Sequence, residues 1–342
     1  MAKSQKVTMR DVAEHVNVSI NTVSLALQDS ALVHADTKAR VLDAVRELGY
    51  RPNVMAQNLR RGVVNTIGIM IPDVHNFHFW DIVDGTHDEA SRNGYGVVLA
   101  HTSLNREREV ETLRGLIERR FDGVILATTY SEQSPIEIRR LINAGGAVVT
   151  LSRTWDGADR VVYFSEQTAT LLLDHLYALG HRRIGLMIGV AREGMAPERI
   201  AAYQQFVSQY GLVSMIEYCG PTVPESVEAT NRLLHYQPRP TAIISVNDYL
   251  AMGVYQSLGM HGLRIPEDVS VAGFDNTHVA ENLYPTLTSV DVGAHDIGRV
   301  SVQLIISRLA DPKRPQQIID MPARLVPRNS TAAPENDVHH RA

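Results

Sequence analysis

The sequence predicts two kinds of structure in one chain: an N-terminal all-α domain, followed by a larger α/β core of two lobes with parallel sheets. Helical periodicity fills residues 8–49, whereas short and almost continuously apolar runs begin at residue 66. Helical patterns separate most of these runs, which is typical of parallel strands covered on both faces. The 342 residues exceed what one ordinary core accommodates, so we expect two or three domains.

Composition indicates the broad class of protein. An apolar content of 44% and a charged content of 21% are those of a soluble globular protein. No apolar run approaches the ~20 residues of a membrane helix, and the polar N-terminus lacks the pattern of a signal peptide. The single cysteine, Cys219, rules out an internal disulfide and suits a reducing cytosol. We therefore expect a cytoplasmic protein with no membrane partner.

Charge is distributed unevenly along the chain. Residues 1–62 contain nine Lys/Arg against six Asp/Glu, a net charge of +3, which leaves −8 for the rest of a chain whose total is −5. A small basic domain on a larger acidic body favours a polyanion as the partner of the small domain. A charge of +3 is a weak signal by itself.

Residues 8–49 are predicted to form three short helices. Thr8 and Asp11 have the spacing of a capping box that opens the first helix, and Ser19 is expected to cap the second. Asp36 is expected to cap the third, in which apolar residues recur at helical spacing. Two helices joined by a tight turn and braced by a third form a helix-turn-helix. The alternative is a helical cap with no role in DNA binding.

A fourth helical segment is short enough to be marginal. Pro52 fits its first turn and Gly62 fits its end, with about eight residues between them. Isolated helices of this length are unstable in water. This segment is therefore either a linker or a helix that forms only with a partner.

The region from residue 66 onward has the pattern of two parallel sheets. Seven or more buried strands over ~260 residues are better divided between two lobes than forced into one sheet. Ligands of such folds bind at the carboxyl ends of the strands, here in the crevice between lobes. The tail from residue 331 has no periodicity and is expected to be mobile. The predicted strands are TIGIMIP, YGVVLAHT, GVILATT, AVVTLSR, RIGLMIG, TAIISVN and VSVAGFD.

Sequence motifs of enzymes are scarce. The chain has no GxxxxGK[ST] phosphate loop, no GxGxxG, no GxSxG and no HExxH. His75 and His78 in HNFHF look like metal ligands, but no cysteine or further histidine accompanies them at ligand spacing. One cysteine and no evident Ser-His-Asp context leave nucleophilic catalysis without a candidate. We therefore expect a protein that is not an enzyme and that uses no metal and no cofactor.

Six segments together resemble the LacI/GalR family of bacterial transcription regulators. They are VTMRDVAEHVNVSINTVSLAL, GYRPNVMAQNLRRG, TIGIMIPD, LGHRRIGLMIG, NDYLAMGVYQSL and IPEDVSVAGFDN, in the family's order from about residue 7 to residue 330. The resemblance implies a periplasmic-binding-protein-like core behind the helix-turn-helix. The implied parts are a DNA-binding domain (7–51), a hinge (52–62), an N-terminal lobe (63–161 and 291–319), a C-terminal lobe (162–290 and 320–330) and a tail (331–342).

The resemblance implies that the second helix lies in the major groove of DNA. Ile20, Asn21 and Leu25 fall at sequence-reading positions, where Asn21 suits an adenine edge and the two aliphatic residues suit thymine methyl groups. Many relatives carry Arg or another polar residue at the position of Leu25, so we expect an A/T-leaning base pair there. Alternatively, Leu25 packs on the third helix. Four hydroxyl residues suit phosphate contacts, which position the protein without specifying sequence: Thr8, Ser19, Thr22 and Ser24.

The resemblance also gives the marginal helix a role. In relatives this hinge, which starts here at Asn53, folds on the operator and two copies open the minor groove. Leu59 matches the residue that wedges into the central base step, and Ala56 allows close approach of the two helices. Arg60 and Arg61 are expected to meet phosphate.

Four residues match the family's effector contacts: Phe79, Arg199, Asn247 and Asp275. Arg199 and Asp275 suit charge-assisted hydrogen bonds to hydroxyls or to a carboxylate, and Phe79 offers a face for stacking. Asp248 is at least as well explained as a helix cap as by ligand contact.

The chain departs from the family at the effector site. Ser152 stands where many relatives carry Asp, and Arg153 follows it, which favours an anionic ligand such as a sugar acid or sugar phosphate. Thr222 stands near the place of an aromatic wall in many relatives. Trp155 is a candidate to replace that wall, and a structural role explains it equally well.

These observations predict a homodimeric repressor that binds a near-palindromic double-stranded DNA operator and responds to a small sugar-like effector. Dimer contacts are expected from residues 110–117 and 249–258, and the absence of leucine heptads in the tail argues against a tetramer. One alternative is a solute-binding module, which requires an export signal and no DNA-reading domain. Another is a sugar-processing enzyme, which requires an acid–base pair, whereas Arg199 and Asp275 form a binding pair.

Overall fold

The structure is a computed structural model that describes residues 7–27, 29–50, 64–127, 131–151, 154–163, 166–189 and 197–335. The chain divides into two compact units, Met1–Val64 and Asn65–Ala342. Within the described residues, no helix has both the length and the apolar character needed to cross a membrane.

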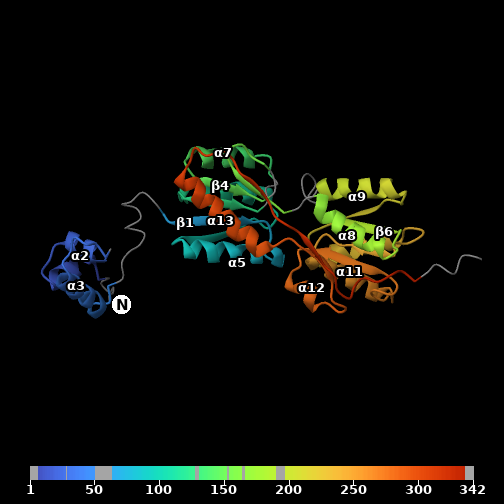
Figure 1. The fold of residues 1–342 in the computed structure, drawn as a ribbon, viewed down its shortest axis with the longest axis horizontal. Helices are drawn as coiled ribbons and strands as arrows, with labels where there is room; N and C mark the ends of the chain where they lie inside the picture. Colours follow the sequence, from blue (N-terminus) through green and yellow to red (C-terminus); the bar gives the residue numbers. More distant parts are fainter. Residues whose placement is uncertain are drawn as a thin grey trace, which may run out of the picture. The chain divides into compact units, whose positions relative to one another are not determined.

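The N-terminal unit contains three helices around a small core of its own, and Figure 1 shows α2 and α3 packed together. α1 spans Met9–His15, α2 spans Ile20–Leu27 and α3 spans Ala35–Glu47. Each helix contributes its apolar stripe to this core, because residues three or four apart lie on one helical face. The buried members are Val12, Ala13, Val16, Val23, Ala26, Val41, Ala44 and Tyr50.

Two of the three predicted helix caps are confirmed. Thr8 and Asp11 form a complete capping box at α1, and Ser19 Oγ accepts a hydrogen bond from Thr22 N at 3.0 Å. The prediction for Asp36 is wrong, because α3 begins at Ala35 and places Asp36 within its first turn. There the carboxylate still interacts favourably with the helix dipole without capping it.

The first sheet of the larger unit is parallel and six-stranded, with the order β11-β5-β4-β3-β1-β2. Residues alternate between its two faces: Ile67 and Ile69 of β1 pack with α5 and α13, whereas Met70 packs with α6 and α7. The strands are β1 (Thr66–Ile71), β2 (Gly96–His101), β3 (Gly123–Leu126), β4 (Ala147–Thr150), β5 (Asp159–Val162) and β11 (Ile318–Asp320). The helices are α5 (Phe77–Arg92), α6 (Arg106–Glu118), α7 (Ser134–Asn143) and α13 (Ala294–Ala310).

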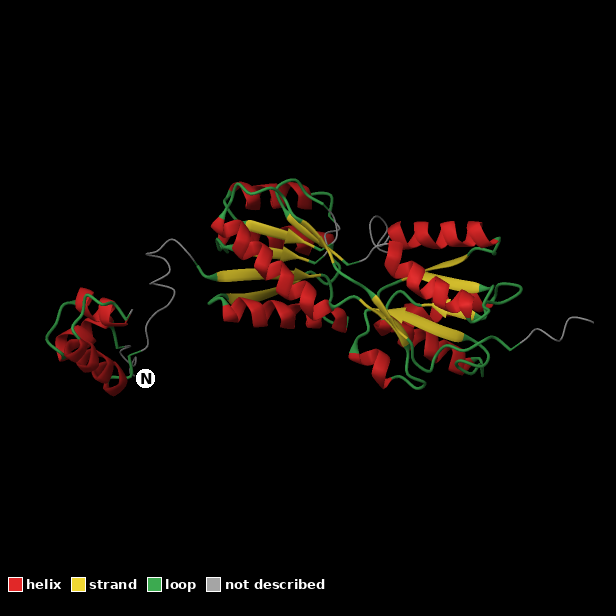
Figure 2. Ribbon diagram, viewed as in Figure 1, coloured by secondary structure: helices red, strands yellow, loops and turns green. Residues whose placement is uncertain are grey.

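The second sheet has the order β12-β10-β9-β8-β6-β7, and its pairs are parallel except β10 with β12. Figure 2 shows helices on both faces of each sheet. The strands are β6 (Ile184–Gly189), β7 (Met215–Cys219), β8 (Ala242–Ile244), β9 (Ser270–Phe274), β10 (Thr288–Asp291) and β12 (Arg324–Val326). The helices are α8 (Glu166–Ala178), α9 (Pro197–Tyr210), α10 (Val223–Leu234), α11 (Asp248–Met260) and α12 (His278–Asn282).

The predicted fold class is confirmed, and all seven apolar runs form strands. The seven apolar runs do not include five other strands of the described residues: β5, β7, β10, β11 and β12. Two of these, β11 and β12, have three residues each and none of them is fully buried, so they carry no continuous apolar signal. The chain passes between the sheets after β5, after β10 and between β11 and β12.

Two glycines permit the tight packing of α5 against α13. A Cβ on Gly85 would lie 1.9 Å from the carbonyl oxygen of His295, and a Cβ on Gly298 would lie 2.1 Å from that of Ile82. Both distances are far inside van der Waals contact. The two helices therefore meet backbone to backbone over the first sheet, as Figure 1 also shows.

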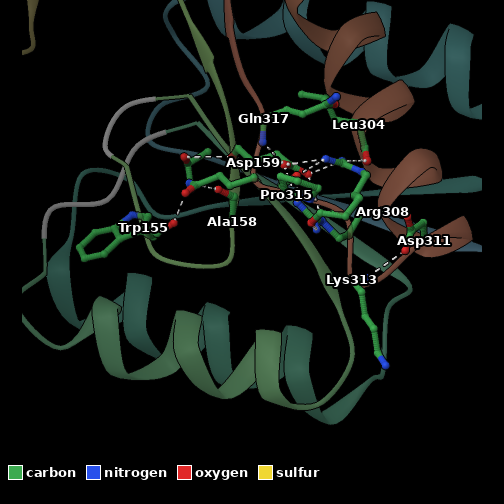
Figure 3. A network of polar contacts seen from close by, with 12 residues as sticks. Trp155, Ala158, Asp159, Leu304, Arg308, Asp311, Lys313, Pro315 and Gln317 are labelled. Carbon is green, nitrogen blue, oxygen red and sulfur yellow. Dashed lines mark hydrogen bonds and ion pairs between the residues drawn. The ribbon is translucent and has the colours of Figure 1, made fainter.

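A buried ionic network attaches the segment after α13 to β5 (Figure 3). Both oxygens of Asp159 accept hydrogen bonds from Arg308, at 2.8 and 3.3 Å, and Arg314 also bonds to both. The backbone N–H of Gln317 donates to the same carboxylate at 2.8 Å. A buried charge requires such partners, and the network fixes the chain just before β11.

The prediction that a mobile tail begins at residue 331 is wrong for its first residues. Thr331 Oγ1 lies 2.9 Å from both Thr288 Oγ1 and His175 Nε2, and the carbonyl of Ala332 accepts from His181 Nε2 at 2.9 Å. Buried hydroxyl and imidazole groups of the C-terminal lobe need hydrogen-bond partners. Residues 331 and 332 supply them.

Candidate functional site

The candidate DNA-reading surface is the outer face of α2. Ile20 is 41% exposed and Asn21 is exposed beside it, while Ser24 and Leu25 are half-buried one turn later. Val23 and Ala26 on the opposite face are buried in the helical core. Leu25 does not belong to the side chains packed on that core, which argues against the alternative that it packs on α3.

The other residues predicted to contact phosphate lie at helix N-termini. The Asp11 carboxylate accepts hydrogen bonds from the backbone N–H of Thr8 at 2.6 Å and from Thr8 Oγ1 at 2.8 Å. Both bonds lower the pKa of the Asp11 carboxyl, and the bond from the N–H has the larger effect. The hydroxyls of Ser19 and Thr22 lie 2.8 Å apart at the start of α2. Backbone N–H groups at a helix N-terminus favour an anion. The predicted contacts Asn53, Ala56, Leu59, Arg60 and Arg61 lie outside the described residues.

The candidate effector site lies where the two sheets point their carboxyl ends toward each other. A cavity of about 610 Å³ is lined by residues that follow strands of both lobes. In each sheet the strand order reverses beside the first strand, β1 or β6, and ligands of open α/β sheets bind at such points. The lining includes Pro72 and Asp73 after β1, Leu104 after β2, Gly189 after β6, Gly220 after β7 and Asn247 after β8.

Two of the predicted effector residues line this cavity, Phe79 and Asn247. Phe79 lies in the first turn of α5 and is buried. The side chain of Asn247 caps α11 by accepting from Leu250 N at 2.8 Å. Ser152 and Arg153 lie outside the described residues.

The other two, Arg199 and Asp275, are buried together in the C-terminal lobe and do not line the cavity. Burial lowers the pKa of the Arg199 guanidinium to about 10, while the negative charge of Asp275 acts in the opposite direction. Arg199 donates to the carbonyl of Val246, which does line the cavity, at 2.8 Å. Its guanidinium carbon also lies 3.7 Å from the centre of the Phe274 ring, a cation–π geometry.

Asp275 has the features of a ligand-binding carboxylate. It follows β9 with φ of +95°, a conformation that L residues seldom adopt and that often marks a functional position. Its Oδ1 is buried and has no hydrogen-bond partner among the described residues. The imidazole Nδ1 of His78 lies 3.8 Å from this oxygen.

His78 belongs to the opposite lobe and is not among the residues predicted from the sequence to contact the effector. It lies in the first turn of α5, is 1% exposed, and its ring stands 5.2 Å from that of Tyr163. In the sequence, the HNFHF segment resembles a metal motif. The feature that makes His78 a candidate is its position beside Phe79, at the start of the helix that follows β1.

Two residues discussed as departures from the family pattern, Thr222 and Trp155, have structural roles. Thr222 forms a capping box with Glu225 at the start of α10, and Trp155 packs against the core of the N-terminal lobe. Tyr218 and Tyr249 are the tyrosines on the cavity wall. Asp248 is neither a cap nor part of that wall.

The described residues contain no group of three or more His, Cys, Asp or Glu that could hold a metal ion. The geometry is that of a binding site: an arginine, a carboxylate and an imidazole converge beside an aromatic-lined cavity between two lobes. An exposed reading helix stands in a separate unit.

Comparison with known proteins gives two matching families. Residues 8–53 match "Bacterial regulatory proteins, lacI family" and residues 173–331 match "Periplasmic binding protein-like domain". The ribose operon repressor of Halalkalibacterium halodurans is 30% identical, over 96% of this chain and 98% of its own length.

Solved structures agree with these matches. The lac repressor dimer bound to operator and the anti-inducer ONPF has a TM-score of 0.84 and 25% identity, over 96% of this chain and all of that one. A LacI family regulator from Enterococcus faecium with bound ribose has a TM-score of 0.70 and 26% identity, over 78% of this chain and 99% of that one. The chain belongs to the lacI family of bacterial regulatory proteins.

Proposed function

We propose that this protein is a homodimeric repressor of transcription whose operator affinity is controlled by a sugar-like metabolite bound between the lobes of its core. The observation that carries the proposal is the convergence of His78, Arg199 and Asp275 from both lobes beside a cavity of about 610 Å³. A site that draws side chains from two lobes can couple ligand binding to their relative position.

The DNA-binding half of the proposal rests on α2. Asn21 can make paired hydrogen bonds to adenine, and Ile20 and Leu25 can contact thymine methyl groups. These are the side chains that α2 presents on its outer face. Ser19 and Thr22 lie at its N-terminus, where a phosphate is favoured.

The effector is proposed to be a sugar or a sugar derivative such as a sugar acid or sugar phosphate. Arg199 and Asp275 supply a charged donor and a charged acceptor for hydroxyl or carboxylate groups. Phe79 supplies an apolar face at the cavity wall. A volume of about 610 Å³ lies within the range of small-molecule sites.

We propose that the dimer forms through exposed apolar side chains of both lobes. Trp80 on α5 and Met252 on α11 are 41% and 40% exposed, and Tyr284 after α12 is 96% exposed. By contrast, residues 110–117, which are expected from the sequence to contribute to the dimer, bury most of their apolar side chains within their own lobe. Val110, Leu113 and Leu116 are buried there. The lac repressor relative was solved as a dimer on its operator.

The experiment that tests the effector proposal is a thermal-shift screen of the full-length protein against sugars, sugar acids, sugar phosphates, polyols and nucleobases. The Asp275→Ala variant is measured alongside. A compound at 100 times its Kd stabilises the folded state by about 2.7 kcal/mol. The proposal requires that one of the sugar classes stabilise the wild type and not the variant. Equal stabilisation of both proteins would remove Asp275 from the site.

The hinge hypothesis has its own test. We propose that Leu59 wedges into the operator, so Leu59→Ala should weaken operator binding several-fold or more. The melting temperature and the response to a stabilising sugar should stay unchanged. Unaltered operator affinity would refute the role of Leu59.

A further inference from the structure

Asp248 is a buried carboxyl group of the C-terminal lobe. It is the first residue of α11 and is 0% exposed. Its Oδ2 accepts from Thr277 N at 2.7 Å and from Thr277 Oγ1 at 3.2 Å, and its Oδ1 accepts from Ser289 Oγ at 2.7 Å. All three donors lie after β9 or in β10, so the carboxylate joins α11 to the turn that follows β9.

That turn carries Asp275 in an unfavourable backbone conformation. Asp275 and Asn276 have φ of +95° and +51°, and residues with side chains keep such angles only where the surroundings impose them. Three consecutive amides of the turn are held. Asp275 N donates to Val290 O at 2.9 Å, Asn276 N to Ser289 Oγ at 3.1 Å, and Thr277 N to Asp248. Two of these three restraints therefore depend on Asp248, directly or through Ser289.

The helix itself does not need this carboxylate. Asn247 caps α11, so the two adjacent polar residues have separate tasks. The space that Asp248 occupies is available because residue 273 is a glycine. A Cβ on Gly273 would lie 2.5 Å from Asp248 Oδ1. The arrangement is specific to holding the turn.

We propose that Asp248 is a positioning residue of the effector site, which fixes the Asp275–Thr277 turn and so presents the Asp275 carboxylate toward His78 and the ligand. The inference rests on the proposed role of Asp275 in effector binding. Asp248 does not line the cavity and acts through its neighbour.

The electrostatics of the site agree with this link. Burial, and next the negative charge of Asp275, raise the pKa of Asp248 to about 8, against the effect of the bonds from Ser289 and Thr277. Ionisation of Asp248 therefore brings a second negative charge close to Asp275. Among the described residues, Tyr255 on α11 is a further titratable group that interacts with Asp248, and its hydroxyl donates to the carbonyl of Pro285.

The first test measures backbone amide exchange in the free full-length protein. Asp248→Asn should accelerate exchange of the Asn276 and Thr277 amides about tenfold or more, because the carboxamide offers one acceptor oxygen in place of two, so that either Ser289 or Thr277 loses its acceptor. Ser289→Ala should affect Asn276 more than Thr277. Amides of β8 and the melting temperature should change little, as they should in the control Asp268→Asn, a surface carboxylate of the same lobe. If the turn amides of Asp248→Asn and Ser289→Ala exchange at the wild-type rate, the proposal is overturned.

The second test uses D-ribose, D-glucose, D-gluconate and D-ribose 5-phosphate as probes in thermal shift. Any probe that stabilises the wild type should need about tenfold more concentration with Asp248→Asn. In the wild type, the probe concentration needed for stabilisation should also change between pH 7 and pH 9. In Asp248→Asn this concentration should not depend on pH over that range. Equal potency and equal pH profiles would contradict positioning. If no probe stabilises the wild type, the proposed effector class fails, and the exchange experiment still decides the role of Asp248.

Discussion

His78 Nδ1 and Asp275 Oδ1 lie 3.8 Å apart, although the two residues belong to different lobes and are 197 positions apart in the sequence. Both side chains are at most 2% exposed. The distance exceeds that of a direct hydrogen bond, so the pair is a close polar contact in a low-dielectric interior. The contact gives the lobes a polar link at the place where we propose that the effector binds.

Removing the imidazole should uncouple the lobes from the ligand. His78→Ala should raise the sugar concentration needed for the half-maximal change in operator binding about tenfold, since each 1.4 kcal/mol of lost interaction is tenfold. Operator affinity without sugar should change by less than about twofold, within the usual range for substitutions outside an interface. Titration of labelled operator with the stabilising sugar measures both quantities.

His87→Ala is the matched control, because His87 lies on the same helix, α5, but is exposed and does not line the cavity. It should behave as wild type. If the two variants respond equally, the contact with Asp275 has no role in the response.

The reading helix makes a prediction about sequence preference. Asn21→Ala should lower affinity for the specific operator by about 1 to 3 kcal/mol and leave binding to non-specific DNA almost unchanged. Leu25→Arg should shift the preferred base pair at one operator position from A·T toward G·C, because Arg pairs with guanine. Selection of operators from a random library with each protein measures both effects. An identical consensus for wild type and Leu25→Arg would show that Leu25 does not face DNA.

Two glycines in helices should respond in opposite ways to alanine. Gly85→Ala should destabilise the core by about 2 to 3 kcal/mol or more, because its Cβ would meet the backbone of α13. Gly115→Ala in α6 has open space around the new Cβ and should stabilise by up to about 1 kcal/mol through helix propensity. Urea unfolding of both variants gives the comparison. Equal free energies would mean that α5 and α13 do not pack so closely.

Acid stability should depend on His181. Burial lowers its pKa to about 4, so between pH 6.5 and pH 4 the unfolded chain binds a proton that the folded chain excludes. The free energy of unfolding should therefore fall as the pH decreases through this range, by about 3 kcal/mol at most from this group. Asp248, whose pKa is raised to about 8, acts in the opposite direction there. The effect of His181 is therefore measured as the difference in the free energy of unfolding between the wild type and His181→Gln at each pH. The variant should lose less stability as the pH decreases.

His235→Gln, an exposed histidine of the same lobe, is the control and should follow the wild-type curve. A pH profile of His181→Gln that coincides with the wild type would contradict a buried neutral imidazole at that position.

The fold could be predicted largely because its strongest signals are local. Apolar runs such as TIGIMIP and the capping box of Thr8 and Asp11 need no information from distant residues. Strand β11 lacked such a signal, because its place in the sheet depends on pairing with β5 and on the Asp159 network. The two strands that pair, β5 and β11, are 158 positions apart in the sequence, so local patterns cannot predict their pairing.

The site was predictable only in part, for the same reason. Phe79 and Asn247 line the cavity, whereas Arg199 and Asp275 are buried and do not line it. His78 and Asp248 contact partners in other elements, at 3.8 Å and 2.7 Å, which spacing along the chain does not reveal. Asp36 shows the converse: a residue type suited to capping lies two positions after the actual cap, His34.

The most direct test of the account is operator affinity of the full-length protein, measured by fluorescence anisotropy with and without the compound that stabilises it. A coupling of about 1 to 3 kcal/mol should change the operator Kd by roughly 5- to 150-fold, and Asp275→Ala should abolish the change. An operator Kd that stays the same at saturating compound would contradict effector control of DNA binding.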